Sequence, residues 1–261
     1  MTRVLSGAAL IALAVAVVWF ANDLVFHLFA AVLIVLCVRE LLVLSAASEL
    51  QLSTFPVTIA ALLTAYVVGV QSGYALEVPM MAALVAIGLN ALGSWRGGAN
   101  ALATVAAALF PALYIGLPIG ALVAVRAFAG PRVLFLLMLT VMVSDSAQYY
   151  TGRALGKRPL APAISPKKTV AGAVGGFVFG TALLVAAGAR WIPTVPLMFR
   201  IGLGLVVVAL GIAGDLFESM IKRSAGVKDS SALIPGHGGV LDRIDALLFA
   251  APIYYIFLKY V

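Results

Sequence analysis

The chain has 261 residues, of which 64% are hydrophobic and only 10% are charged. A soluble globular domain carries about 25% charged residues, so the composition excludes that class and indicates a protein that crosses a membrane several times. The net charge is +7, and the single cysteine, Cys37, excludes an intrachain disulfide. We expect the positive charge to orient the chain in the bilayer, and we expect no nucleic-acid partner.

Nine apolar runs are candidate transmembrane helices, because a span needs about 20 mostly apolar residues. In chain order they cover residues 4–20, 24–44, 55–71, 78–92, 101–125, 133–150, 170–189, 201–217 and 241–260. We therefore predict an all-α integral membrane protein of about nine helices that form one continuous membrane domain. Residues 1–130 carry few charges and are predicted to be N-terminal scaffold helices, whereas residues 131–261 form the predicted catalytic region.

Basic residues are distributed unevenly between the two sides of the predicted membrane. With nine spans, twelve of the 17 Lys and Arg residues fall on the side of the N-terminus and five on the other. Cytoplasmic segments are enriched in Lys and Arg, so the N-terminus and both long basic loops are predicted to be cytoplasmic. We expect a multi-pass protein of a cytoplasmic or inner membrane, with its active site near the cytoplasmic face.

The first candidate site residue is Asp145, which lies between Ser144 and Ser146 inside the sixth apolar run. A carboxylate at that depth costs a few kcal/mol or more unless it faces a polar cavity, a cation or a partner. We therefore predict that Asp145 lies in a polar cavity, while a helix-end carboxylate that pairs with a nearby arginine such as Arg153 is the alternative interpretation.

The second candidate segment is AISPKKTVAG, at residues 163–172. Pro166 disfavours helix at Ser165, and Lys167, Lys168 and Thr169 then precede a new apolar run. Lysines and hydroxyls at the start of a helix suit a phosphate group, because backbone amides and the helix dipole add to their charge. Adjacent lysines at this position also serve as ordinary orientation signals, so the segment alone leaves both interpretations open.

The third and longest candidate segment covers residues 214–245. Asp215, Glu218, Ser219 and Lys222 are spaced so that they share one face of a helix. Such a carboxylate pair with a hydroxyl suits Mg²⁺, which prefers oxygen ligands and usually retains waters and substrate phosphates. The following loop carries further charged, glycine and histidine positions that let backbone approach a ligand, namely Lys228, Asp229, His237, Gly238, Gly239, Asp242, Arg243 and Asp245.

The stretch at residues 219–245 resembles the signature of the phosphatidate cytidylyltransferases, or CDP-diacylglycerol synthases. It reads S-x-x-K-R-x4-K-D-x-S-x2-I-P-x-H-G-G-V-x-D-R-I-D without a gap. Upstream, SDSAQYYTGRALGK and SPKKTVAG are similar to two further segments of that family. One departure is that Val170 and Ala171 stand where Trp-Glu is common, which removes a carboxylate at position 171.

The resemblance implies Mg²⁺-dependent transfer of CMP from CTP to phosphatidic acid, giving CDP-diacylglycerol and pyrophosphate. It implies metal binding by Asp215 and Asp242, while a second metal ion and a homodimer are left open. The residues expected to be catalytic are Asp145, Lys167, Lys168, Lys222, Arg223 and Asp242. The positions expected to bind CTP are Ser165, Thr169, Lys228, Asp229, His237, Gly238, Gly239 and Arg243.

Two alternative functions remain at this point. A CTP-dependent lipid or polyprenol kinase would use similar metal-binding and basic residues, but it would release CDP instead of pyrophosphate. An ion-coupled transporter would use Asp145 and Asp215 as coupling sites near the middle of the membrane. Polar residues concentrated on one predicted face and the lack of an obvious repeat argue against the transporter.

Overall fold

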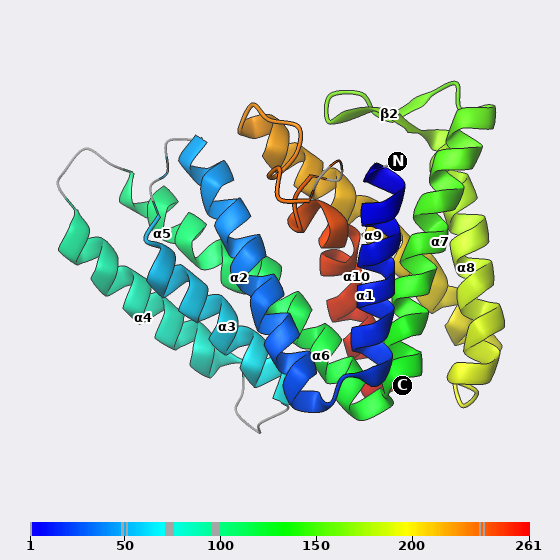
Figure 1. Cartoon of the computed structure of the whole chain (residues 1–261), viewed down its shortest axis with the longest axis horizontal. Helices are drawn as coiled ribbons and strands as arrows, with labels where there is room; N and C mark the ends of the chain where they lie inside the picture. The colour runs from blue at the N-terminus through cyan, green and yellow to red at the C-terminus, as the bar shows by residue number, and fades with distance from the viewer. Residues whose placement is uncertain are drawn as a thin grey trace.

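The computed structural model describes residues 2–47, 50, 52–70, 76–95, 100–234, 236 and 238–261. These residues form a bundle of long helices with one small β-hairpin at its end (Figure 1). The elements, in chain order, are α1 (Thr2–Phe20), α2 (Asp23–Ala47), α3 (Thr54–Val70), α4 (Glu77–Ser94), α5 (Ala101–Pro111), the π-helical segment η1 (Ala112–Gly116), α6 (Leu117–Ala129), α7 (Pro131–Leu155), β1 (Pro159–Ala161), β2 (Ser165–Thr169), α8 (Val170–Trp191), α9 (Leu197–Ser224) and α10 (Leu241–Tyr260).

The helical membrane fold predicted from the apolar runs is confirmed. Each of the nine predicted runs coincides with a helical segment of the described chain, and α5, η1 and α6 together make up the run predicted at 101–125. Six of the described segments are long and apolar enough to cross a membrane. Pro111 has no N–H to donate, and the helix continues past it through one π-helical turn instead of ending.

Small residues allow the helices to approach closely. Gly116 and Gly120 face Ala61 and Ala65 of α3 so tightly that an added Cβ at either glycine would overlap the α3 backbone. On α8, a Cβ at Gly172 would overlap the Gln148 carbonyl oxygen of α7. Glycine and alanine at such spacing are typical of membrane helix contacts, where van der Waals packing of backbones drives association.

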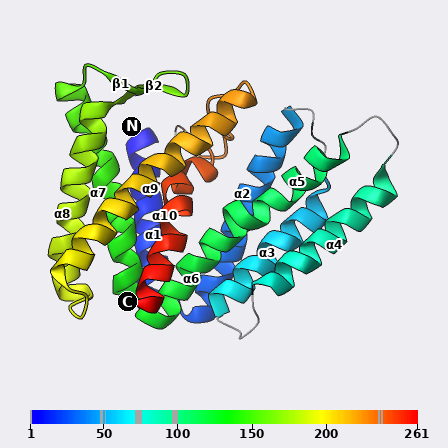
Figure 2. The same ribbon diagram turned by 180° about the vertical axis from the view of Figure 1, so that it is seen from behind.

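The loops that carry the predicted site lie at the same end of the bundle. The N-terminus, the β-hairpin and the loop between α9 and α10 all lie at that end, whereas the C-terminus lies at the other (Figure 1). Figure 2 shows α9 crossing the bundle obliquely toward this end. The arrangement agrees with the prediction that both basic loops share the side of the N-terminus.

The β-hairpin was not predicted by the sequence pattern, in which Pro166 only disfavoured helix at Ser165. Strands β1 and β2 pair antiparallel, with Pro159 opposite Thr169 and Ala161 opposite Ser165. The Val170 N–H donates to the Arg158 carbonyl at 3.0 Å, which joins the hairpin to the first residue of α8. This pairing holds Lys167 and Lys168 on a short extended strand above the helix ends.

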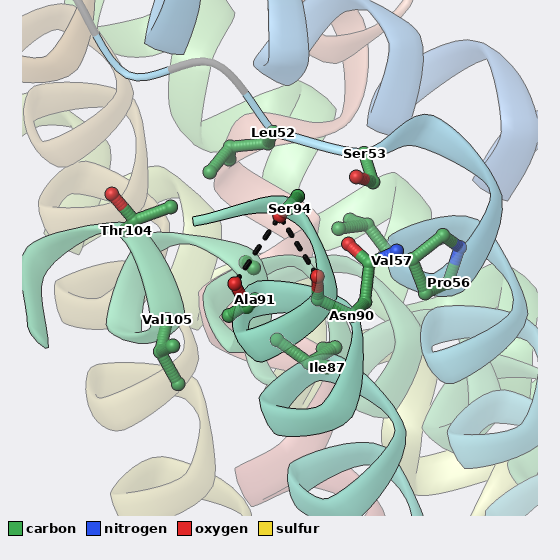
Figure 3. A pocket seen from close by; sticks show the side chains of 11 residues that line it. Leu52, Ser53, Pro56, Val57, Ile87, Asn90, Ala91, Ser94, Thr104 and Val105 are labelled. Atoms are coloured by element: carbon green, nitrogen blue, oxygen red, sulfur yellow. Dashed lines mark hydrogen bonds between the residues drawn. The ribbon is translucent and has the colours of Figure 1, made fainter. Parts of the chain in front are cut away.

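A small cavity of about 40 Å³ lies among α3, α4 and α5 in the N-terminal half (Figure 3). Ser94 on its wall donates to the carbonyl oxygens of Asn90, at 2.8 Å, and Ala91, at 3.3 Å. Its lining includes Ser53 and Thr104 but no ionisable side chain. The cavity is therefore separate from the charged cluster described next.

Candidate active site

Lys168 and Asp215 join two of the predicted segments. The Lys168 amine on β2 lies 2.5 Å from Asp215 Oδ2 on α9. The Ser219 hydroxyl, one turn further along α9, lies 3.4 Å from Asp215 Oδ1. The structure therefore brings together a lysine and a carboxylate that are 47 positions apart in the sequence.

Three carboxylates on three helices lie within electrostatic range of one another. Asp215 on α9 repels both Asp145 on α7 and Asp245 on α10. Lys168 offsets part of this negative charge, and Gln148 donates to Asp145 Oδ1 at 3.0 Å. Asp245, in the second turn of α10, accepts from the Ala246 N–H at 2.7 Å and belongs to the acidic cluster.

Lys222 lies buried between two carboxylates. Its amine forms an ion pair with Glu218 on the same helix and lies 2.5 Å from Asp242 Oδ1 on α10. The side chain of Glu218 is 0% exposed and that of Asp242 is 4% exposed. Lys222 thus links the end of α9 to the start of α10, while its predicted contact with a substrate phosphate stays a prediction.

Asp242 has donors on both of its carboxylate oxygens. Oδ1 accepts from the Lys222 amine, whereas Oδ2 accepts from the backbone N–H groups of Ser230 at 3.0 Å and Gly239 at 2.7 Å. The Ser230 hydroxyl is also 3.0 Å from Oδ2. Gly238 has φ of +79°, a conformation that glycine adopts without strain, and this turn delivers the Gly239 N–H to Asp242.

The other predicted site residues lie around this cluster in different settings. Thr169 caps α8 by accepting from the Gly172 N–H at 3.1 Å, and Arg223 donates to the carbonyls of Ile164 and Val227 at 3.4 and 3.0 Å. Ser165 begins β2, and His237 lies outside the described residues. Side chains exposed at this end of the bundle are Lys167, Lys228, Asp229 and Arg243.

The carboxylates also allow a test of the expected Mg²⁺. Among the residues that the structure describes, no three Asp, Glu, His or Cys side chains converge at metal-ligand spacing. Mg²⁺ commonly needs only one or two carboxylates, because substrate phosphates and water complete its shell. The surplus of negative charge around Asp215 fits such a site, whereas a metal at Asp242 would have to displace the Lys222 amine.

Glu40 is the residue at this site that the sequence reasoning missed. It lies on α2, in the half predicted to be scaffold, yet it is only 5% exposed and its carboxylate accepts hydrogen bonds from the loop between α9 and α10. The available signal was a lone acid within a long apolar helix, which by default marks a functional position.

An apolar cavity lies beside the charged cluster. It has a volume of about 330 Å³, and Phe249 on its wall lies one helical turn after Asp245 on α10. Phe217 on α9 and Tyr114 on η1 also line it, and their rings pack edge-on with centroids 5.4 Å apart. The remaining lining residues are Phe110, Leu113, Pro118, Leu248 and Pro252. Charged groups and a hydrocarbon-lined space therefore adjoin each other.

Comparison with known proteins gives consistent matches. A family model described as the Cytidylyltransferase family matches residues 1–261. A phosphatidate cytidylyltransferase from Haemophilus influenzae is 46% identical over 137 residues, which are 49% of this chain and 47% of that protein. One from Bacillus subtilis is 38% identical over 151 residues, covering 56% and 55% of the two chains. The uncharacterized protein YnbB of Escherichia coli is 44% identical over 128 residues, covering 49% and 42%. The chain spans about half the length of the curated relatives it matches.

Proposed function

Because the chain belongs to the cytidylyltransferase family, we propose that it transfers CMP from CTP to phosphatidic acid, producing CDP-diacylglycerol and pyrophosphate. The observation that carries this proposal is the Lys168–Asp215 pair at one end of an apolar bundle, next to a hydrocarbon-lined cavity. A lipid phosphate at the membrane surface and a water-soluble nucleotide can both reach such a position. Two of the relatives carry the name phosphatidate cytidylyltransferase, which supports the same choice of substrates.

In the proposed reaction a phosphate oxygen of phosphatidic acid attacks the α-phosphorus of CTP. A new P–O bond forms as the bond from the α-phosphorus to the oxygen bridging to the β-phosphate breaks, and that electron pair leaves on pyrophosphate. Both reactants are anions, so the protein chiefly has to position them and neutralise their charge. In this proposal Lys168, which pairs with Asp215, and the exposed Lys167 contact the triphosphate.

Mg²⁺ belongs to the proposal as well. Asp215 is the residue best placed to hold it together with the nucleotide, and Asp242 remains the second predicted ligand. When bound, the ion would stabilise the negative charge that develops on the leaving pyrophosphate. Lys168, the ion-pair partner of Asp215, would neutralise part of the phosphate charge.

The proposed position of this site is the cytoplasmic side of the membrane. CTP is a cytosolic nucleotide, and the excess of Lys and Arg at the end that carries the β-hairpin supports the same orientation. Phosphatidic acid would enter from the surrounding bilayer through the cavity beside Phe217. A homodimer is left open by the proposal.

The test uses the full chain purified in detergent with phosphatidic acid, Mg²⁺ and CTP labelled in the cytidine. We expect label in the lipid extract and an equal amount of pyrophosphate. Asp215→Asn is expected to reduce turnover at least tenfold and to change its dependence on Mg²⁺, whereas Glu77→Gln, an exposed acid at the start of α4, should not. CDP in place of pyrophosphate would identify a kinase, and no label in the lipid from folded protein would overturn the proposal.

A further inference from the structure

The Glu40 carboxylate is almost completely enclosed by the loop between α9 and α10. Its Oε1 accepts from the Ser231 hydroxyl at 2.7 Å and from the Val240 N–H at 2.9 Å. Its Oε2 accepts from the Leu241 N–H at 2.8 Å and lies 2.9 Å from the Ser230 hydroxyl. All of these donors lie about 190 to 201 positions away in the sequence.

These contacts satisfy the hydrogen-bonding groups of both the Glu40 carboxylate and the backbone at the start of α10. The N–H groups at the start of a helix have no acceptor within the helix, and the positive end of the helix dipole favours a carboxylate there. Glu40 supplies that carboxylate to α10 from a different helix. A Cβ at Gly239 would overlap both the Glu40 carboxylate and Ser230 Oγ, so a glycine at this position allows the close approach.

Ser230 connects Glu40 to the charged cluster. Its hydroxyl lies 2.9 Å from Glu40 Oε2 and 3.0 Å from Asp242 Oδ2, and its single proton serves one of them at a time. Its backbone N–H donates to Asp242 as well. Asp242 in turn pairs with Lys222. A continuous series of polar contacts thus runs from the N-terminal half to the end of α9.

We propose that Glu40 is a positioning residue that holds Ser230 and Ser231 against the start of α10 and thereby sets the place of Asp242 and Lys222 in the active site. The effect on catalysis rests on the proposed cytidylyltransferase function, whereas the effect on the loop does not. The N-terminal helices then contribute a group to the active site in addition to embedding the protein in the membrane.

The experiment compares Glu40→Gln with Glu77→Gln in the full chain in detergent, measuring hydrogen exchange along the loop and steady-state kinetics. Gln keeps the size of the side chain but replaces one acceptor oxygen with an NH₂ group, which opposes one backbone N–H at the start of α10. We expect exchange at the Val240 and Leu241 amides to rise at least tenfold and kcat to fall at least tenfold in Glu40→Gln alone. KM for CTP should change by a smaller factor than kcat, because Ser165 and Thr169 on the β-hairpin, which are also expected to contact CTP, lie outside this loop.

Three outcomes separate the two proposals. The role of Glu40 would be overturned if Glu40→Gln showed wild-type hydrogen-exchange rates at the Val240 and Leu241 amides and a kcat within twofold of wild type. Faster hydrogen exchange in Glu40→Gln, together with a folded wild-type protein that transfers no cytidine label, would support the hold on the loop. It would overturn the cytidylyltransferase proposal alone. If Glu40→Gln does not fold, Ser231→Ala removes one donor to the same carboxylate. It should raise loop exchange and lower kcat by twofold or more, and unchanged values for both would overturn the inference.

Discussion

Replacement of Lys222 by Met should destabilise the protein by several kcal/mol. The substitution leaves two carboxylates, Glu218 and Asp242, without their shared cation in a site where their side chains are 0% and 4% exposed. Removing one partner of a buried ion pair costs about 3–5 kcal/mol, because the remaining charge has lost its compensation. Most of the loss should come from Glu218, because in the described part of the chain only Lys222 donates to its oxygens, whereas Asp242 keeps its Ser230 and Gly239 donors.

This reasoning makes the double variant informative. Lys222→Met combined with Glu218→Met places two apolar side chains of suitable size in the same space, and such replacements of buried pairs are often neutral or stabilising. We therefore expect the double variant to recover at least half of the stability that Lys222→Met loses. Its activity should remain low, because the predicted catalytic lysine is absent.

The measurement is the free energy of unfolding in mixed detergent micelles, with Lys228→Met as the matched control. Lys228 is an exposed lysine on the adjoining loop, and surface substitutions usually change stability by less than about 0.5 kcal/mol. A loss below about 1 kcal/mol for Lys222→Met would refute the assignment of a buried pair that depends on its cation. So would a double variant that is less stable than Lys222→Met alone.

Two further predictions concern packing and capping. Gly116→Ala should lower the free energy of unfolding by about 1–3 kcal/mol, because the new Cβ would overlap the Ala61 backbone, whereas Gly202→Ala, with open space around it, should be neutral or slightly stabilising. Equal effects of the two glycine variants would contradict the described contact between α3 and η1. Thr169→Val removes the cap of α8 and should cost about 0.5–2 kcal/mol, with faster tryptic cleavage at the β-hairpin, while Thr169→Ser should behave like wild type. Unchanged cleavage in Thr169→Val would show that strand pairing alone holds the hairpin.

The helices were predictable because each apolar run is long and its ends carry charges or helix-breaking residues. The run predicted at 170–189, for example, corresponds to α8 at Val170–Trp191, which begins directly after its Thr169 cap. The β-hairpin was not predictable from local pattern, because β1 has three residues and β2 five. Strands this short depend on their pairing and on the helices at either side, which periodicity does not report.

Within the site, the sequence pattern identified residues but not their partners. Helical spacing correctly placed Asp215 and Ser219 on one face, and Glu218 with Lys222. That Lys222 is enclosed by a second acid follows from the approach of α10, and no spacing within α9 encodes that approach. Glu40 was missed for the same reason, because its donors are far away in the chain and become visible only when α2 and α10 are placed together.

The glycine contacts of α8 limit the direction from which, under the proposed function, a hydrocarbon tail would arrive at Asp215. A Cβ at Gly176 would overlap the Gln148 side chain of α7, and one at Gly180 would overlap Val208 of α9, so this flank is a closed seam. An acyl chain is wider than the methyl group that would already overlap there, so it could enter only if the helices separated. The flank toward Phe217 and Tyr114 already holds space, so under the proposed function a lipid tail would reach the site from that flank alone.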